Sequence, residues 1–181
     1  MRQLIKKNII MKKLIPLILL VFFSVGLIAQ SPTKIGFVDT QYILEQMPAY
    51  QNAINQLDNL SAQWQQELEQ KYAEIDQMYR KYQAEAYLLP QNEKIKRENE
   101  IVEAEKAAKE LQKKYFGPEG ELFQRRKALL QPIQNQLYEA INDYAKKNRM
   151  GAIFDISNNT TLLFYDNKLD ITNDIKMNLG L

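Results

Sequence analysis

The sequence predicts an α+β protein in which a long antiparallel helical hairpin, a coiled-coil-like arm, projects from a small β body. Three observations predict this fold. Strand-like segments lie at both ends of the chain that follows the first thirty residues, and about a hundred residues of helical periodicity lie between them. A break that contains proline interrupts this periodicity near its middle, where the chain can reverse.

The N-terminal residues 1–29 have the organisation of a secretory signal peptide. They hold five basic residues and no acidic residue, and Lys12 and Lys13 stand directly before an apolar run over residues 14–29. A spanning helix needs about 20 apolar residues, whereas basic, then apolar, then small residues is the order of a signal peptide. We therefore expect an exported protein that is located in the periplasm, and an uncleaved membrane anchor is the alternative.

Two details of this segment stay open. Cleavage is expected after Ala29, with Gly26 as the alternative, and translation starts at Met1 or at Met11. Removing the five basic residues of the segment from the total of 24 leaves 19 basic and 22 acidic residues, a net charge of −3. The mature chain is therefore not the basic protein that a nucleic-acid partner would require, and we expect no such partner.

The composition excludes several classes of chemistry. The 181 residues include no histidine and no cysteine. A Ser–His–Asp relay, thiol catalysis, disulfide bonds and Cys/His zinc sites are therefore impossible. We expect no catalytic residue, no metal site and no cofactor, and hence a protein that is not an enzyme.

The β body is predicted from residues 30–47 and 133–181. Strands are expected over residues 34–40, 150–157 and 160–166, with Asn158 and Asn159 turning the chain between the last two strands. Asp39 or Thr40 is suited to cap a following helix, and a short helix over residues 172–179 has Asp170 or Thr172 as its cap. Three short strands cannot bury both of their faces alone, so the body is expected to self-associate. Its expected core residues are Ile35, Phe37, Val38, Ile153, Phe154, Ile156, Leu162, Leu163, Phe164 and Ile171.

The helical arm is predicted over residues 48–132, with its tip near residues 88–92. Twelve apolar positions span 39 residues at a mean step of 39/11, about 3.55, which lies between the coiled-coil and straight-helix values. They are Tyr50, Ile54, Leu57, Leu60, Trp64, Leu68, Tyr72, Ile75, Tyr79, Tyr82, Ala86 and Leu89. The returning helix has a thin seam of Ile95, Val102, Ala108 and Leu111, which strengthens as Leu122, Leu129, Ile133, Leu137, Ile141 and Tyr144. At ~1.5 Å per residue each half of the hairpin would reach roughly 60 Å.

A glycine- and proline-containing segment interrupts the returning helix. Counting outward from the tip places residues 117–120 opposite residues 61–64. We favour a kink that accommodates Trp64 against Tyr115 and Phe116, and a hinge that lets the arm bend is compatible with it. The expected hinge residues are Gly117, Pro118 and Gly120.

Several segments together carry a family resemblance. They are the exported start IGFVDTQYILEQMP, the long charged hairpin, LLQPIQNQLYEAI leading into AIFDISN, and the closing DIT helix. In this order they resemble the Skp/OmpH family of periplasmic chaperones. The resemblance implies a homotrimer whose shared β body holds three arms around a central cavity, and ATP-independent holding of unfolded outer-membrane proteins. Membrane contact is then expected only at the periphery.

A chaperone of this kind needs a weakly adhesive surface on its arms. Methionine adapts its shape, and tyrosine combines contact area with a polar tip. Residues of this kind along the arm are Met47, Tyr72, Met78, Tyr79, Tyr82, Tyr87 and Leu88. The tyrosines at 72, 79 and 82 fall on the seam count, so the candidate client-binding residues are Met78, Tyr87 and Leu88. The alternative function is a structural coiled-coil scaffold of the cell envelope that binds no clients.

Overall fold

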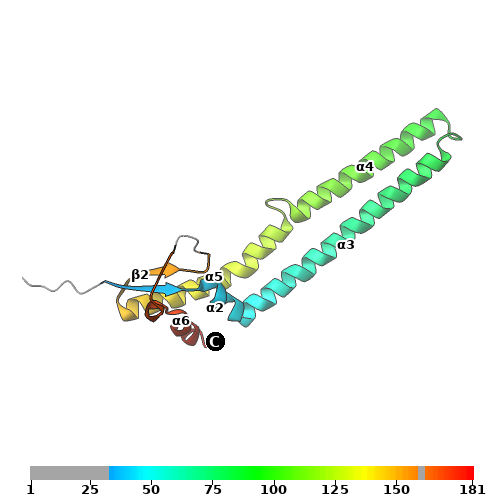
Figure 1. Cartoon of the computed structure of the whole chain (residues 1–181). Helices are drawn as coiled ribbons and strands as arrows, with labels where there is room; N and C mark the ends of the chain where they lie inside the picture. The colour runs from blue at the N-terminus through cyan, green and yellow to red at the C-terminus, as the bar shows by residue number, and fades with distance from the viewer. Residues whose placement is uncertain (1–32, 159–161) are drawn as a thin grey trace, which may run out of the picture. The chain divides into compact units, whose positions relative to one another are not determined.

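A computed structural model describes residues 33–158 and 162–181, so the predicted signal peptide and its cleavage site lie outside the described residues. The chain is mostly helical, with long helices and a small sheet of two strands (Figure 1). In chain order the elements are β1 (Lys34–Val38), α2 (Thr40–Gln46), α3 (Pro48–Glu85), α4 (Gln91–Phe116), α5 (Glu121–Asn148), β2 (Met150–Asp155), η1 (Asn167–Leu169) and α6 (Thr172–Asn178).

Two of the three predicted strands are confirmed. Strands β1 and β2 are neighbours in the sheet, and the pairing extends past the end of β2, where the Ile156 amide donates to the Val38 carbonyl at 2.9 Å. On the other side of β1, the Ile171 amide donates to the Phe37 carbonyl at 2.8 Å, next to an isolated parallel bridge between Phe37 and Asp170. Over the described residues 162–171, the backbone before α6 therefore pairs with β1 at a single isolated bridge.

The third predicted strand is wrong over the part that the structure describes. Residues 162–166 form no strand, and the rest of the predicted turn and strand, residues 159–161, lies outside the described residues. Leu163 is 97% exposed and Phe164 is 84% exposed, so the apolar side chains that suggested a buried strand have no cover in a single chain. Strand-forming residues need a partner for their backbone and one buried face, and this single chain supplies neither to Leu163 and Phe164.

The predicted cap of α2 is present, whereas the N-cap position of α6 is Ile171 and not Asp170 or Thr172. Asp39 is the N-cap of α2, where its Oδ1 accepts a hydrogen bond from the Tyr42 amide at 2.9 Å. Asp170 Oδ1 accepts from the Thr172 amide at 2.8 Å at the start of α6. Each carboxylate satisfies an amide that the first turn of the helix leaves without a partner.

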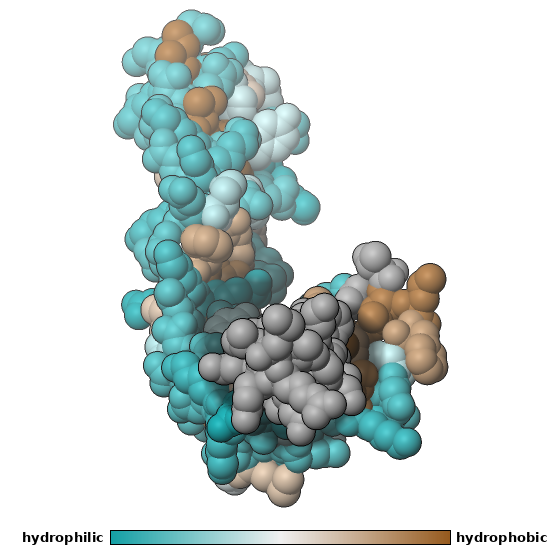
Figure 2. Space-filling view, turned by 90° about the vertical axis from the view of Figure 1, so that its left-hand side faces the viewer, coloured by the Kyte–Doolittle hydropathy of each residue, from teal (hydrophilic) through white to brown (hydrophobic). Residues whose placement is uncertain are grey.

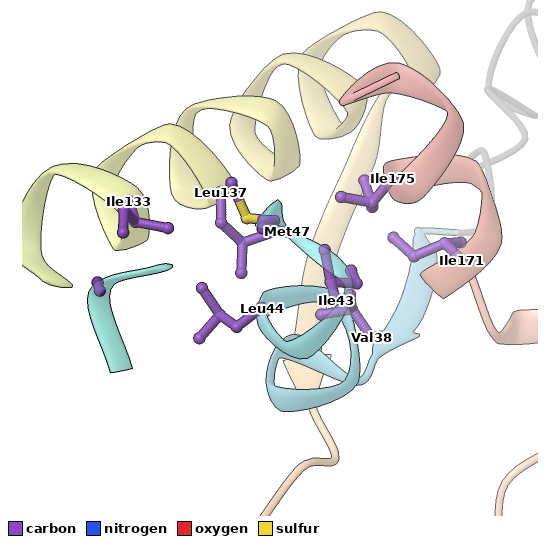
Figure 3. Close-up of a cluster of buried hydrophobic side chains, with 9 residues drawn as sticks. Val38, Ile43, Leu44, Met47, Ile133, Leu137, Ile171 and Ile175 are labelled. Carbon is purple, nitrogen blue, oxygen red and sulfur yellow. The ribbon is translucent and has the colours of Figure 1, made fainter. Parts of the chain in front are cut away.

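The main core lies in the body, between β1, α2, α5, α6 and the beginning of α3 (Figure 3). Nine buried residues form it: Val38, Ile43, Leu44, Met47, Ala53, Ile133, Leu137, Ile171 and Ile175. In Figure 3 Leu137 projects from α5 toward Met47, while Ile171 and Ile175 come from the C-terminal segment. Met47 was counted above among the contacts of the arm, but it is 4% exposed and belongs to this core. Pro48 begins α3 directly after it, which places the first turn of the arm against the body.

The arm is a hairpin of two antiparallel helical limbs. Helices α3 and α4 lie side by side in Figure 1 and are joined by residues 86–90, and α5 continues the returning limb toward the body. Proline cannot donate to a helical hydrogen bond and disfavours a helical conformation in the residue before it, which is consistent with α4 beginning directly after Pro90. The predicted reversal between the two limbs is therefore confirmed.

The seam of the arm differs from the predicted one on α4. Its buried cluster consists of Ile75, Ile101 and Ala108, with Met78, Tyr82 and Ala104 packed against it. Val102 and Ile95, which the sequence placed on the seam, are about half exposed. Adjacent residues on a helix point about 100° apart, so only one of Ile101 and Val102 can face α3.

Candidate functional site

The residues predicted to contact clients lie in two different environments. Tyr87 is 79% exposed and Leu88 is 70% exposed, and both lie in the segment that joins α3 to α4 at the tip of the arm. Met78 is partly buried and packs against the cluster of Ile75, Ile101 and Ala108. Tyr87 and Leu88 are therefore available to another molecule, whereas much of the Met78 side chain is covered by its packing within the arm.

The structure also exposes four large side chains along the arm that the sequence analysis had placed in the seam. Tyr72 and Tyr79 on α3, and Ile95 and Val102 on α4, are each between 41% and 57% exposed. We call these four residues the aromatic–aliphatic stripe. The two members on each helix are seven residues apart, so they lie on one face of their helix, two turns from each other.

Two side-chain hydrogen bonds cross the hairpin near the aromatic–aliphatic stripe. The Tyr72 hydroxyl donates to Gln112 Oε1 at 3.1 Å, and the Tyr82 hydroxyl donates to Glu98 Oε1. On α4, Glu98 is three residues after Ile95 and four before Val102, so these three residues share one face of the helix. The seven-residue spacing could have revealed the stripe in the sequence, but only with the register of the hairpin known.

Polar bonds between the helices supplement the small apolar seam. Arg97 Nη1 lies 2.6 Å from Glu85 Oε2 across the hairpin, near the tip. The hydrogen bond to Glu98 and burial raise the pKa of Tyr82, because a phenolate beside a carboxylate would be repelled. The pKa of Tyr115 is raised in the same way by its hydrogen bond to Glu67 at 2.9 Å. These tyrosines remain neutral donors at physiological pH.

The break in the returning limb is surrounded by aromatic rings, as predicted. Trp64 stacks on Tyr115 with ring centroids 4.5 Å apart and an interplanar angle of 5°, and Phe116 meets Trp64 edge-on at 6.2 Å. Helix α4 ends at Phe116, and α5 begins at Glu121. The kink that accommodates Trp64 is therefore confirmed, while the hinge role of residues 117–120 stays a prediction.

The predicted body core is only partly covered in a single chain. Phe37, Val38 and Ile171 are buried, and Ile153, Ile156 and Leu162 are partly buried. The exposed members are Ile35, Phe154, Leu163 and Phe164. Figure 2 shows hydrophobic side chains both at the edge of the body and along the arm.

Aromatic packing connects the covered and the exposed parts of the body. Phe37 contacts Phe154 with centroids 5.7 Å apart, and Tyr165 with centroids 4.9 Å apart. Phe154 is nevertheless about half exposed. The exposed apolar side chains of the body therefore adjoin the buried ones.

The two aspartates that follow or end the strands have structural partners. Thr40 Oγ1 donates to Asp155 Oδ2 at 2.6 Å, and the Ser157 amide donates to Asp155 Oδ1 at 3.0 Å. Burial raises the pKa of Asp155, but the hydrogen bonds from Thr40 and Ser157 outweigh it, so the pKa is lowered overall. Asp39 caps α2, as described above. Both carboxylates thus fix the junction between the sheet and α2.

The described part of the chain offers no geometry for a bound metal. Within residues 33–158 and 162–181, no group of three or more acidic side chains lies close enough to hold an ion. Over the same residues, no helix combines the length and the hydropathy that a membrane crossing requires.

Comparison with known proteins identifies the family. The model of the family described as outer membrane protein (OmpH-like) matches residues 34–179. The chain belongs to the OmpH-like family. The matched range covers every helix and strand of the described residues, from β1 to α6.

A solved structure supports the OmpH-like fold independently. A candidate outer membrane chaperone (OmpH-like) from Caulobacter crescentus CB15 matches with a TM-score of 0.67 and 11% identity, over 83% of this chain and 86% of that chain. At this identity the likeness shows the fold alone. The search of curated proteins found no match.

Proposed function

We propose that this protein is an ATP-independent holdase chaperone of the periplasm, which binds unfolded outer-membrane proteins between the helical arms of a homotrimer and prevents their aggregation. Membership of the OmpH-like family and the fold shared with a candidate outer membrane chaperone support this proposal. The observation that carries it is the arm, a long thin hairpin that exposes the aromatic–aliphatic stripe and the apolar tip.

The composition of the arm suits weak binding to many sequences. Large apolar patches on a soluble protein promote its own aggregation, whereas half-exposed side chains separated by polar residues do not. Tyr72 and Tyr79 offer large rings with polar tips, and Ile95 and Val102 offer aliphatic contacts. Such contacts are individually weak, and three arms that act together would hold a client with much higher avidity.

The trimer is proposed to form through the exposed apolar part of the body. Leu163 and Phe164 lie almost fully exposed beside a sheet of only two strands, and Ile35 and Phe154 are exposed on those strands. A sheet this small is marginal by itself, and neighbouring copies would add both strand partners and apolar cover. The family resemblance implies three copies.

The first experiment is to dilute an unfolded outer-membrane β-barrel protein from urea and to follow light scattering without nucleotide. We expect the mature protein to suppress aggregation near a one-to-one ratio of client to trimer. A Tyr79→Ser, Val102→Ser double variant should need about tenfold more protein, since about 1.4 kcal/mol of lost contact weakens binding tenfold. A Gln77→Ser, Glu103→Ser variant is the matched control, because these exposed side chains lie about 200° around the same helices from the seam residues Ile75 and Ile101.

The outcomes separate the two candidate functions. If the unmodified protein leaves the scattering unchanged, the scaffold alternative stands and the holdase proposal is rejected. If both double variants protect equally well, the stripe does not hold clients. Photo-crosslinkers at Met78, Tyr79, Tyr87 and Leu88 would then locate the contact directly.

Sedimentation tests the assembly that the proposal needs. We expect a trimer, and we expect a Leu163→Ser, Phe164→Ser variant to dissociate at concentrations where the unmodified protein stays assembled. A stable monomer of the unmodified protein would remove the enclosed cavity and with it the proposed mechanism.

A further inference from the structure

A groove of about 400 Å³ lies between α3 and α5, on the body side of the helix break. Its volume is near the lower end of the ~300–1,000 Å³ typical of ligand pockets. The apolar part of its wall consists of Leu57, Leu60, Trp64, Ala128 and Leu129. The polar part consists of Gln56, Asn59, Gln63 and Arg125.

Along the hairpin, the groove lies between the body cluster and the cluster of the arm, and one of its wall residues, Leu57, is itself buried. The body cluster reaches outward as far as Leu129, and the cluster of the arm begins at Ile75 and Ala108. Between them the small side chain of Ala128 on α5 lines the groove together with Leu60 and Trp64 on α3. The Trp64 ring cannot swing into this space without losing its stacking on Tyr115.

The charge at the groove has one sign. None of its nine lining residues is acidic, and Arg125 supplies the one charged side chain. Among the ion pairs of residues 33–158 and 162–181, none involves Arg125, Arg126 or Lys127. The three amide side chains add further hydrogen-bond donors. A guanidinium with amide donors beside an apolar floor is complementary to a carboxylate next to an apolar side chain.

We propose that this groove binds internal segments of unfolded client chains in which an aromatic or aliphatic side chain adjoins an aspartate or glutamate. The apolar side chain lies against Leu60, Trp64 and Leu129, and the carboxylate accepts hydrogen bonds from Arg125. The assignment rests on the proposed holdase function and adds a preference to it, because no acidic residue lines the groove beside Arg125. At the stripe, by contrast, Val102 lies among glutamates as well as lysines.

The chain carries its own probe for this site. Trp64 is the only tryptophan in the sequence and forms part of the groove wall, so its fluorescence reports occupancy directly. The ligands are two tryptophan-free peptides with blocked ends, acetyl-Gly-Phe-Asp-Gly-amide and its Phe-Asn analogue. We expect a saturable change in Trp64 emission with the first peptide, and binding of the analogue that is weaker by about three- to tenfold.

Three variants test the residues. Arg125→Gln should bind both peptides equally, while the neighbouring Lys127→Gln should keep the preference for the acidic peptide. Ala128→Leu fills the groove and should remove the response to both peptides. Circular dichroism checks that the Ala128→Leu variant keeps its helices. If that variant does not fold, the Arg125→Gln result alone decides whether the groove binds the acidic peptide.

Four results would overturn the assignment. These are an unchanged Trp64 emission, an acidic preference that survives Arg125→Gln, a response that survives Ala128→Leu in a folded protein, and tighter binding of a peptide whose only carboxylate is its C-terminus. Aggregation assays on the same protein distinguish failure of the groove proposal from failure of the holdase proposal. Suppression of aggregation without peptide binding rejects the groove alone, and peptide binding without suppression rejects the holdase function alone.

Discussion

The body and the arm bury apolar side chains in different ways. In the body, nine buried residues from five elements form one cluster, and Ile43, Leu137, Ile175 and Val38 have almost no exposure. In the middle of the arm, the cluster has three buried residues, and hydrogen bonds such as that of Tyr72 to Gln112 join the two helices. A hairpin of two helices has too little interior for more. We therefore infer that most of the free energy of folding comes from the body, whereas the arm leaves apolar side chains exposed for contact with other molecules.

The strongest test of this comparison removes one core side chain from each region. Leu137→Ala in the body should lower the free energy of unfolding by about 2–5 kcal/mol, because it leaves a cavity in a closely packed cluster. Ile101→Ala in the arm should cost about 1–2 kcal/mol, since the thin cluster can collapse around the gap. Urea unfolding followed by circular dichroism measures both. Equal losses would contradict the difference between the regions.

The next test acts on the break between the two regions. A Cβ added at Gly120 would lie 2.8 Å from the Gly117 nitrogen and from the carbonyl oxygens of Lys114 and Tyr115. Because all three atoms are backbone, Gly120→Ala should cost about 1–3 kcal/mol and loosen the stacking of Trp64 on Tyr115. Trp64 emission and thermal unfolding report the change.

The control for this substitution is Glu119→Ala in the same loop, whose side chain is exposed. It should leave both the emission and the unfolding temperature nearly unchanged. A Gly120→Ala protein that behaves like this control would show that the break does not depend on a close backbone approach.

Tyrosine hydroxyls allow the two regions to be compared by the same substitution. The Tyr144 hydroxyl donates to Asp174 Oδ2 at 2.6 Å and joins α5 to α6 in the body. Tyr144→Phe should therefore cost about 1 kcal/mol. Tyr72→Phe in the arm should cost less than about 0.5 kcal/mol, because its hydrogen bond to Gln112 is exposed to water.

The stabilisation from the hydrogen bond of Tyr144 to Asp174 is expected to decrease at high pH. The hydrogen bond to Asp174, burial and repulsion by that carboxylate raise the pKa of Tyr144 from 10.0 to about 12. The folded-state pKa lies above the unfolded value, so this stabilisation is complete below pH 10 and is lost as the pH rises toward 12. Stability measured between pH 9 and 12 should fall less steeply for Tyr144→Phe than for the unmodified chain, and parallel curves would reject the assignment.

The smallest effect is expected at the junction of the sheet and α2. The pKa of Asp155 is lowered from 3.8, since the hydrogen bonds from Thr40 and Ser157 outweigh burial. Its contribution to stability is therefore present above the unfolded pKa and is lost as the pH falls through the folded pKa. Asp155→Asn should cost less than about 1 kcal/mol near pH 7 and flatten the acid dependence below pH 4. Asp143→Asn, on an exposed position of α5, is the control, and an equal change there would contradict the prediction.

Much of the helical structure could be predicted from the sequence because helices are local structures. The reversal before Pro90, the carboxylate cap at Asp39 and the meeting of Trp64 with Tyr115 all follow from periodicity, from backbone chemistry or from counting along two antiparallel rods. The hydrogen-bonding needs of a helix end are fixed by its own residues. The cap and the reversal therefore do not depend on distant parts of the chain, and the Trp64–Tyr115 contact requires only the antiparallel hairpin.

The sequence by itself thus determined the order of the helices, the site of the reversal and the absence of thiol and imidazole chemistry. Only the tertiary structure decided which of Ile101 and Val102 faces α3, and that Leu163 and Phe164 lie uncovered instead of in a third strand. The physical reason is that helical hydrogen bonds close within the segment, whereas a strand and a packing face exist only against a partner. The local sequence does not determine where that partner lies.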